Sequence, residues 1–349
     1  MHYNREISFE NMKKIIDLEI KNKSKESIIT FFGGEPLLKK DLIYDIVKYI
    51  KSKKSKTRFL YNMTTNGVLI DDEFVKFFEN NDFISLSISI DGAADSQNEN
   101  RVTKNGMATY ELVAQNVKKM LSKSEIVVAV PVVTKNNVRY SYQNICNIIE
   151  MGFKKISFQF DFTANWTDED LSIIKEEFEK ISQKYIERMR NEIHLIEIDE
   201  KIRTYIDDEI DCNNNCSVGL RDVNVGTDGN IYPCMQFMYN EEYVIGNCND
   251  GIDKNRQIEV HKMLKEEMID CKECAYKKRC NHTCSCLNKA YTGNPKQVAP
   301  FTCEIERLMI DTADNIAEIL FKEKNPVFIQ KFYNRFYNSI ERTINKRKE

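Results

Sequence analysis

A dense group of cysteines constrains this chain more than any other feature of its sequence. Four of them stand close together, with two, five and three residues between successive thiols: Cys271, Cys274, Cys280 and Cys284. The residues between them are mostly polar or basic, so these thiols cannot be spread through a hydrophobic core and must converge on a common partner. Ten of the eleven cysteines fall within residues 212–303, and the first 211 residues contain only Cys146. The cysteine-rich part and the rest of the chain therefore need separate explanations.

The composition is typical of a soluble globular protein. The chain has 349 residues, of which 42% are hydrophobic and 30% charged, enough for two or three domains or for one large domain with an appendage. A net charge of -3 gives no reason to expect nucleic-acid binding. No apolar stretch is long enough to span a bilayer and no signal peptide is recognisable, so we expect a cytoplasmic protein without a membrane partner. Thiols stay reduced in the cytoplasm, which favours metal ligation over disulfides.

Short apolar and β-branched runs alternate with helical patterns in the first part of the chain. The runs predict five strands: Ile28–Phe32, Arg58–Met63, Ile84–Ile90, Ile126–Val133 and Lys155–Phe162. Some of these runs are apolar on both faces, so we expect a parallel sheet covered by helices. Three strands end in turns with possible chemistry, namely Gly-Gly-Glu-Pro at 33–36, Thr-Thr-Asn-Gly at 64–67 and Asp-Gly at 91–92. Parallel sheets place their functional sites at such strand ends.

The first predicted element is a helix over Phe9–Ile20, whereas βα architecture normally begins with a strand. Either this helix is an addition, or the chain begins one strand late. Helical periodicity also covers residues 40–51, 72–79, 109–121, 142–151, 168–189, 304–322 and 326–346. We therefore divide the chain into a partial barrel (1–165), a helical connection (166–210), a cysteine-rich domain (211–303) and C-terminal helices (304–349).

Three kinds of partner could hold the clustered thiols. Zinc accepts four thiolates tetrahedrally, so the cysteines could form one or two zinc sites, and His282 allows a site of three thiolates and one imidazole. Iron–sulfur clusters also take four thiolates each, so eight cysteines would serve two [4Fe–4S] clusters. Disulfides are the least favoured option. Spacing alone leaves zinc and iron–sulfur clusters open.

Seven cysteines and a glycine match in order the pattern CX9–15GX4C, then CX2CX5CX3C, then one late cysteine. The matching residues are Cys216, Gly229, Cys234, Cys271, Cys274, Cys280, Cys284 and Cys303. This region therefore resembles the SPASM domain of radical S-adenosylmethionine (SAM) enzymes, which mature peptides and proteins. The earlier part is similar to the radical SAM core, since FFGGEPLL at residues 31–38 resembles its GGEP turn and SISIDG at residues 87–92 its fourth-strand motif.

The resemblance implies two auxiliary [4Fe–4S] clusters. The first would be bound by Cys212, Cys216, Cys234 and Cys284, and the second by Cys271, Cys274, Cys280 and Cys303. Cys212 lies outside the core pattern, which makes it the least secure of the eight ligands. Cys286 is a spare or substitute ligand, Cys248 matches nothing, and Cys146 is interpreted as a buried small hydrophobic residue.

The resemblance also implies contacts with SAM at the strand ends. The turn of Gly33, Gly34 and Glu35 would bind the methionine ammonium, since glycine lets the backbone approach a ligand closely. Ser89 would contact the ribose, and Arg101 the methionine carboxylate. Phe162, at the end of the last predicted strand, would meet the adenine.

One part of the radical SAM core is missing from the sequence. That family carries a CX3CX2C loop after its first strand, and the [4Fe–4S] cluster of this loop cleaves SAM, but no cysteine precedes Cys146 here. We therefore expect a partial (β/α)6 TIM-like barrel of radical SAM type that lacks its first strand and this cluster. A truncated chain and a natural homologue without the cluster both fit, and we favour truncation because GGEP, Ser89 and Arg101 serve little purpose without SAM. The strand Ile28–Phe32 would then be an exposed sheet edge beside an apolar barrel interior, an aggregation hazard.

The resemblance implies a radical SAM/SPASM maturase that acts on a peptide or protein side chain, is inactive as written, and uses a reductant such as flavodoxin or ferredoxin. In the sulfatase-maturing branch an aspartate follows the cysteine equivalent to Cys234, whereas Met235 stands here. This difference disfavours formylglycine formation and favours thioether or other crosslinks. Two alternatives are a non-catalytic iron–sulfur module that binds a peptide or transfers electrons, and a zinc-stapled structural protein.

Overall fold

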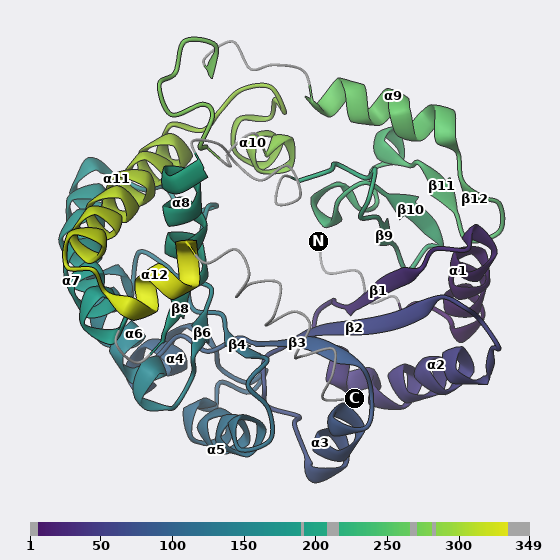
Figure 1. The fold of residues 1–349 in the computed structure, drawn as a ribbon. Coiled ribbons are helices and arrows are strands. Elements are labelled where there is room, and N and C mark those ends of the chain that lie inside the picture. Colours follow the sequence, from purple (N-terminus) through teal and green to yellow (C-terminus); the bar gives the residue numbers. More distant parts are fainter. Residues whose placement is uncertain (1–5, 190–191, 208–215, 266–270, 281–283, 334–349) are drawn as a thin grey trace.

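The computed structural model describes residues 6–189, 192–207, 216–265, 271–280 and 284–333. Its main sheet has six parallel strands in the order β1-β2-β3-β4-β6-β8. The strands are β1 (Glu26–Phe31), β2 (Arg58–Thr65), β3 (Phe83–Ile88), β4 (Val127–Ala129), β6 (Lys155–Ile156) and β8 (His194–Leu195). They form an arc with helices along its outer side (Figure 1). This agrees with the predicted partial TIM-like α/β barrel, and β1 is the end strand of the sheet.

Helices cover the outer face of the arc, and all of them except α1 follow a strand of the chain. They are α1 (Phe9–Asn22), α2 (Lys40–Ser52), α3 (Asp72–Glu79), α4 (Ala94–Asn100), α5 (Tyr110–Leu121), α6 (Ser141–Glu150) and α7 (Asp168–Arg188). Side chains set the helix starts. The Asp71 carboxylate accepts from the Phe74 amide at 2.8 Å before α3, and Thr167 and Asp170 form a capping box at the start of α7.

Two predicted strands are each broken into two. The continuous run Ile126–Val133 forms β4 and the separate β5 (Val132–Val133), because Pro131 has no amide hydrogen to donate to a sheet ladder. The run Lys155–Phe162 likewise forms β6 and β7 (Gln159–Phe160), and β5 pairs with β7 in parallel. Strand β8 has only two residues, and the apolar pattern gave no sign of it.

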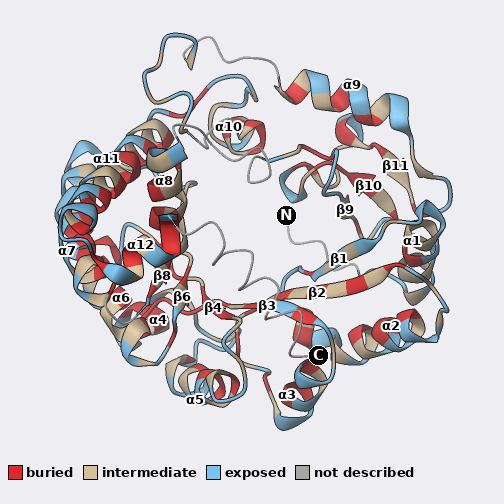
Figure 2. Ribbon diagram, in the orientation of Figure 1, coloured by how far each residue is buried: buried red, intermediate tan, exposed pale blue. Residues whose placement is uncertain are grey.

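The two faces of the sheet differ in chemistry. Residues facing the helices are apolar and buried: for example, the Tyr61 and Phe83 rings lie 5.6 Å apart, and Phe83 contacts Phe74 of α3. Buried residues accordingly lie where helices meet strands (Figure 2). The opposite face is partly exposed and carries mostly polar side chains that the strand register places side by side: Thr30, Asn62, Thr64, Ser85 and Ser87. The expected apolar interior is thus limited to residues such as Ile28, which is 55% exposed on β1.

The cysteine-rich region has a small core of its own. A four-stranded antiparallel sheet in the order β12-β11-β10-β9 comprises β9 (Asn224–Val225), β10 (Asn230–Tyr232), β11 (Gly246–Asn247) and β12 (Gly251–Ile252), and α9 (Lys254–Lys265) and α10 (Ser285–Thr292) follow it. Its buried side chains include Ile231, Tyr243 and Leu264. Ile15 of α1 packs against this core, and Lys14 donates to Asn249 at 2.7 Å. The small sheet therefore lies against the first helix (Figure 1).

The last helices return to the main core. Helix α8 (Ile196–Asp207), α11 (Pro300–Lys322) and α12 (Pro326–Tyr333) lie beside α7, and Ile305, Ile316 and Phe328 are fully buried in the main core (Figure 1). The predicted domain boundaries remain predictions. Short 3-10 turns occur at Pro36–Lys39, Val138–Tyr140, Met235–Phe237 and Glu241–Tyr243. Among the helices that the structure describes, none is long and apolar enough to cross a membrane.

Candidate active site and thiol groups

The Gly-Gly-Glu-Pro turn connects the ends of two neighbouring strands. It follows β1, and its Glu35 carboxylate accepts a hydrogen bond from the Leu37 amide at 3.0 Å. The same carboxylate accepts from the Thr65 hydroxyl and the Asn66 amide, both at 2.7 Å. Thr65 ends β2 and Asn66 follows it, so the predicted turns after β1 and β2 form one hydrogen-bonded structure.

Gly33 and Gly34 leave open space beside this turn. A Cβ atom at either position would meet no other atom within 4 Å, and Gly33 has a φ of +153°, a backbone conformation that favours glycine. The backbone here is open to close approach by a ligand, whereas the Glu35 carboxylate is already engaged by three donors. Glu35 therefore holds the turn in shape.

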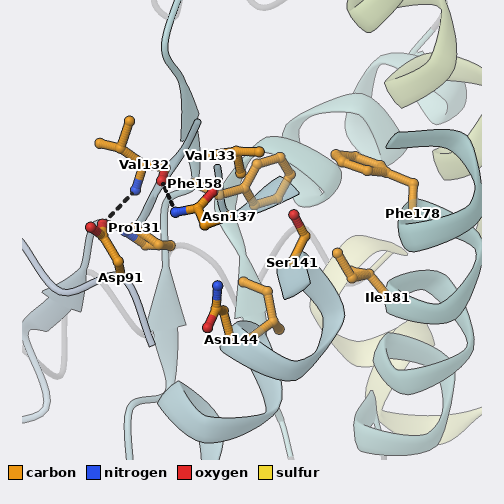
Figure 3. A pocket seen from close by; sticks show the side chains of 11 residues that line it. Asp91, Pro131, Val132, Val133, Asn137, Ser141, Asn144, Phe158, Phe178 and Ile181 are labelled. Atoms are coloured by element: carbon orange, nitrogen blue, oxygen red, sulfur yellow. Dashed lines mark hydrogen bonds between the residues drawn. The ribbon is translucent and has the colours of Figure 1, made fainter. Parts of the chain in front are cut away.

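Arg101 forms a bidentate ion pair with Asp91, which follows β3. Arg101 Nε and Nη2 donate to the two carboxylate oxygens at 2.9 and 2.8 Å. The Asp91 side chain is 1% exposed and that of Arg101 is 24% exposed. Asp91 Oδ1 also accepts from the Val132 amide at 2.9 Å (Figure 3). A second carboxylate could bind only to the part of the guanidinium that Asp91 does not engage, and sequence reasoning missed this role of Asp91.

A cavity of about 20 Å³ lies behind Asp91, where Figure 3 shows Asn137, Asn144 and Phe178 around it. This volume holds about one water molecule. It is far too small for SAM or a peptide. The cavity therefore belongs to the packing between the sheet and its covering helices.

Ser89 and Phe162 lie at the ends of β3 and β7. The Ser89 amide donates to the Thr65 carbonyl at 2.9 Å, and its side chain continues the polar face of Ser85 and Ser87. The Phe162 ring meets Tyr291 of α10 and Phe301 of α11 edge-on, at 6.3 Å each. Phe162 therefore joins the end of the barrel strands to the cysteine-rich region and to α11.

Glu197, a residue that sequence reasoning missed, places a carboxyl group at the end of β8. It accepts from the Ser157 hydroxyl at 2.6 Å, from the Gln159 side-chain amide at 3.2 Å and from the Phe158 backbone amide at 3.2 Å. The residue is partly exposed as a whole, but these groups enclose its carboxyl, and burial raises the pKa of Glu197 to about 7. Acidic residues are common at helix starts, so the sequence gave no sign that the Glu197 carboxyl is enclosed.

One group of thiols lies at the start of α10. The Cys286 thiol is in hydrogen-bond contact with the sulfurs of both Cys234 and Cys284. The contact with Cys286 lowers the pKa of Cys234 to about 7. Cys216 is exposed, and Cys212 lies outside the described residues. The structure thus brings together two of the four predicted ligands of the first cluster and adds Cys286 to them.

The glycine of the cysteine pattern has a structural reason. Gly229 lies in the turn between β9 and β10 with a φ of +83°, and a Cβ there would approach the Asn11 side chain to 3.1 Å. Strand β10 then ends two residues before Cys234. The four residues between Gly229 and Cys234 therefore comprise strand β10 and the one residue that follows it.

A second group of thiols lies where the loop 271–280 meets α11. Burial raises the pKa of Cys303, and the neighbouring Cys271 and Cys274 thiolates add to this effect. The Arg307 guanidinium is in hydrogen-bond contact with Cys274. Cys280 follows Arg279, which is anchored to Asp314 on α11. Three of the four predicted ligands of the second cluster are thus mutual neighbours.

No disulfide involves Cys234, Cys274 or Cys303. Within the described ranges, no three His, Cys, Asp or Glu side chains meet closely enough to hold one metal ion. A [4Fe–4S] cluster binds each thiolate through a different iron atom, so its thiols need not meet at a single point. The donor set of both groups is thiol only, which is the set that such clusters take.

Comparison with known proteins identifies the N-terminal part. Residues 1–151 match the family model of the radical SAM superfamily. These residues form a radical SAM domain. A 279-residue stretch is 26% identical to the cysteine-type anaerobic sulfatase-maturating enzyme of Clostridium perfringens strain 13, and covers 73% of this chain and 72% of that enzyme. A 185-residue stretch is 31% identical to an uncharacterized protein of Methanocaldococcus jannaschii, with 52% of this chain matched to 62% of that protein's length.

Two solved structures share the fold. The structure of anSMEcpe with bound AdoMet superposes with a TM-score of 0.76 over 89% of this chain and 90% of that one, at 19% identity. The structure of Streptococcus suis SuiB bound to the precursor peptide SuiA gives a TM-score of 0.59 over 87% and 71% of the two chains, at 16% identity. The similarity extends over the barrel and the cysteine-rich region together, so the overall α/β architecture of such enzymes is present here.

Proposed function

We propose that this chain is of the radical SAM maturase type, which modifies a side chain of a peptide or protein, and that its residues bind SAM and the substrate. The observation that carries this proposal is the separation of the thiols into two groups beside a radical SAM domain whose inner face is polar. Two relatives point the same way, one a sulfatase-maturating enzyme and the other a structure with a precursor peptide bound.

In this proposal the thiols bind two [4Fe–4S] clusters. The first is bound by Cys212, Cys216, Cys234 and Cys284, with Cys286 as a substitute ligand, and the second by Cys271, Cys274, Cys280 and Cys303. Such clusters, when bound, supply one-electron transfer and a site for substrate. The two contact groups, one at the start of α10 and one at the start of α11, support this division.

The barrel residues bind and orient the small molecules. The backbone at Gly33 and Gly34 binds the methionine ammonium of SAM, and Glu35 fixes the turn through Thr65 and Asn66. Asp91 aims the Arg101 guanidinium, whose free side binds the methionine carboxylate. Ser89 contacts the ribose and Phe162 borders the adenine, and hydroxyl side chains of the inner face contact the substrate.

The relatives' own reaction is not the one we propose for this chain. Met235 stands where sulfatase-maturing enzymes carry an aspartate; it is 42% exposed and cannot accept a proton. We therefore propose a thioether or other crosslink in a peptide, with a flavodoxin or ferredoxin as reductant in the cytoplasm. Since no cysteine precedes Cys146, we also propose that these 349 residues alone do not cleave SAM.

Two measurements test the proposal. Calorimetric titration of SAM into the anaerobic protein should show binding. Asp91→Asn should weaken this binding, because the ion pair that orients the Arg101 guanidinium is lost. Reductant and SAM should yield no 5′-deoxyadenosine with these residues alone, and appreciable turnover would overturn that claim. A protein that carries iron but does not bind SAM would instead be the non-catalytic peptide-binding or electron-transfer module. Zinc in place of iron would leave only a structural protein.

A further inference from the structure

Helix α11 carries Cys303 and, along the same face, residues that contact the loop of the other thiols. The residues on this face are Cys303, Arg307, Asp311 and Asp314, at intervals of four, four and three. Arg307 contacts the Cys274 thiol. Asp311 accepts a hydrogen bond from the Tyr276 hydroxyl at 3.0 Å. Helix α11 therefore carries the Cys303 thiol together with the side chains that bind the loop of Cys271, Cys274 and Cys280.

The strongest anchor is Arg279, the residue before Cys280. Its guanidinium forms a bidentate pair with Asp314, in which Nη1 lies 2.8 Å from one carboxylate oxygen and Nη2 contacts the other. Nε donates to the Thr204 hydroxyl of α8 at 3.1 Å. The Arg279 side chain is only 15% exposed. A planar fork bound on two sides allows one orientation of this residue.

The backbone of Arg279 is held as well as its side chain. Lys201 Nζ of α8 donates to the Arg279 carbonyl at 3.0 Å. The Lys201 ammonium is also paired with the Glu306 carboxylate of α11, and these side chains are 3% and 4% exposed. Buried charges are costly unless they are paired, so Lys201 and Glu306 stay together. Through the Arg279 carbonyl, Lys201 fixes the backbone immediately before Cys280.

The loop between the anchors is itself folded into consecutive turns. The Cys274 amide donates to the Cys271 carbonyl at 3.3 Å, the Lys277 amide to the Cys274 carbonyl at 3.1 Å, and the Arg279 amide to the Tyr276 carbonyl at 2.9 Å. None of these contacts requires a metal. The path of the loop is therefore defined by hydrogen bonds within the protein.

We propose that α8 and α11 hold the loop 271–280 beside Cys303 in the metal-free protein, with Asp314, Arg279 and Lys201 as positioning residues for the second thiol group. The identity of the metal group rests on the proposed function, but the positioning is a property of this chain alone. The second thiol group would then be preorganised, so the free energy of metal binding would not be reduced by the entropy cost of ordering the loop.

The first test uses the metal-free protein. Asp314→Asn keeps the size of the side chain and removes the charge that Arg279 binds. We expect amide hydrogen exchange at Cys274, Lys277 and Arg279 to become at least about tenfold faster in this variant. Glu318→Gln is the matched control, because among the described residues Glu318 is paired with the exposed Lys322 on the same helix and not with the loop. Exchange as slow in Asp314→Asn as in the control, or wild-type exchange as fast as in Asp314→Asn, overturns the inference.

The second test loads the protein with iron and sulfide under anaerobic conditions. We expect Asp314→Asn to lose about half of the iron of the wild type and one of two reduced-cluster signals in electron paramagnetic resonance, while Glu318→Gln loses neither. Arg279→Lys should lose the same signal as Asp314→Asn, because a lysine ammonium cannot form the bidentate pair with Asp314. Full iron and unchanged spectra in Asp314→Asn contradict the positioning role.

The two tests separate the two ideas. If the wild type takes up no iron, the proposed function fails, and hydrogen exchange still decides whether the loop is held. If Asp314→Asn does not fold, as judged by circular dichroism, Tyr276→Phe removes only the hydrogen bond to Asp311. That variant should accelerate exchange at Lys277, and an unchanged rate there counts against the inference.

Discussion

At the scale of single residues, Asp91 and Glu197 show how the site departs from its sequence motifs. The motif implies that Arg101 binds a ligand carboxylate, but the structure pairs Arg101 with Asp91 of its own chain. Asp91 is 1% exposed and belongs to the Asp-Gly turn after β3. The turn could be predicted from the sequence, but the pairing of Asp91 with Arg101 could not. Glu197 had no motif at all. Its environment depends on Ser157 and Gln159, forty and thirty-eight residues away in the chain.

Glu197 predicts a pH dependence of stability. Its pKa is raised from 4.5 to about 7 in the folded protein, so between these values the folded state binds more protons than the unfolded state and stability falls as pH rises. The fall should be roughly 3 kcal/mol in total across this window. Glu197→Gln should remove that part of the slope, as measured by urea unfolding at pH 5 and pH 7.5. The exposed Glu187→Gln is the control, and an equal slope in both variants would contradict the prediction.

The thiols predict a division of the iron between two groups. Cys234→Ala removes a thiol that Cys286 contacts, so we expect iron to fall by about half. Cys248→Ala removes a buried thiol that matches no part of the cysteine pattern, and this variant should keep its full iron. Iron and labile sulfide analysis after anaerobic reconstitution distinguishes the two. An equal loss in both variants would mean that the loss reflects damaged packing rather than a missing ligand.

At the scale of elements, close approach between loops and helices explains where glycine is needed. Gly92 has a φ of +113°, and a Cβ there would lie 2.5 Å from the backbone of Asn144 in α6. Gly106 also has a positive φ, +76°, but open space around it. We expect Gly106→Ala to cost about 1 kcal/mol through backbone strain, and Gly92→Ala to cost at least about 2 kcal/mol because the contact adds to the strain. Chemical denaturation of both variants checks this, and equal costs would show that the contact with Asn144 is relieved easily.

Long periodic elements could be predicted from the sequence, and short ones could not. The helices over 72–79 and 168–188 agree with their apolar period, because their cores and caps lie within the segment itself. Strand β8, with two residues, exists because β6 offers it a partner. The small sheet β9–β12 consists of strands of two or three residues whose pairing is set by glycine turns and by packing on α1. Such elements depend on tertiary context and leave no period in the sequence.

At the scale of the whole molecule, two cores meet through elements far apart in sequence. Helix α1 contacts the small sheet, and Phe162 at the end of β7 contacts Tyr291 and Phe301. The polar face of the main sheet is the face opposite its covering helices, and the thiol groups lie in the loop 271–280, at the start of α10 and on α11. Cys271, Cys274 and Cys303, which the cysteine motif groups together, lie near one another, whereas the contact of Cys286 with Cys234 and Cys284 is not part of the motif. The motif did not predict the anchors on α8 and α11, because ion pairs between distant helices have no local pattern.

The central claim is that the two thiol groups hold iron–sulfur clusters beside a radical SAM domain. Metal and labile sulfide analysis of anaerobically purified protein tests it most directly. Two [4Fe–4S] clusters predict about eight irons and about eight sulfides per chain. Zinc without iron or sulfide would contradict the account and leave the cysteine-rich region as a zinc-stapled structural element.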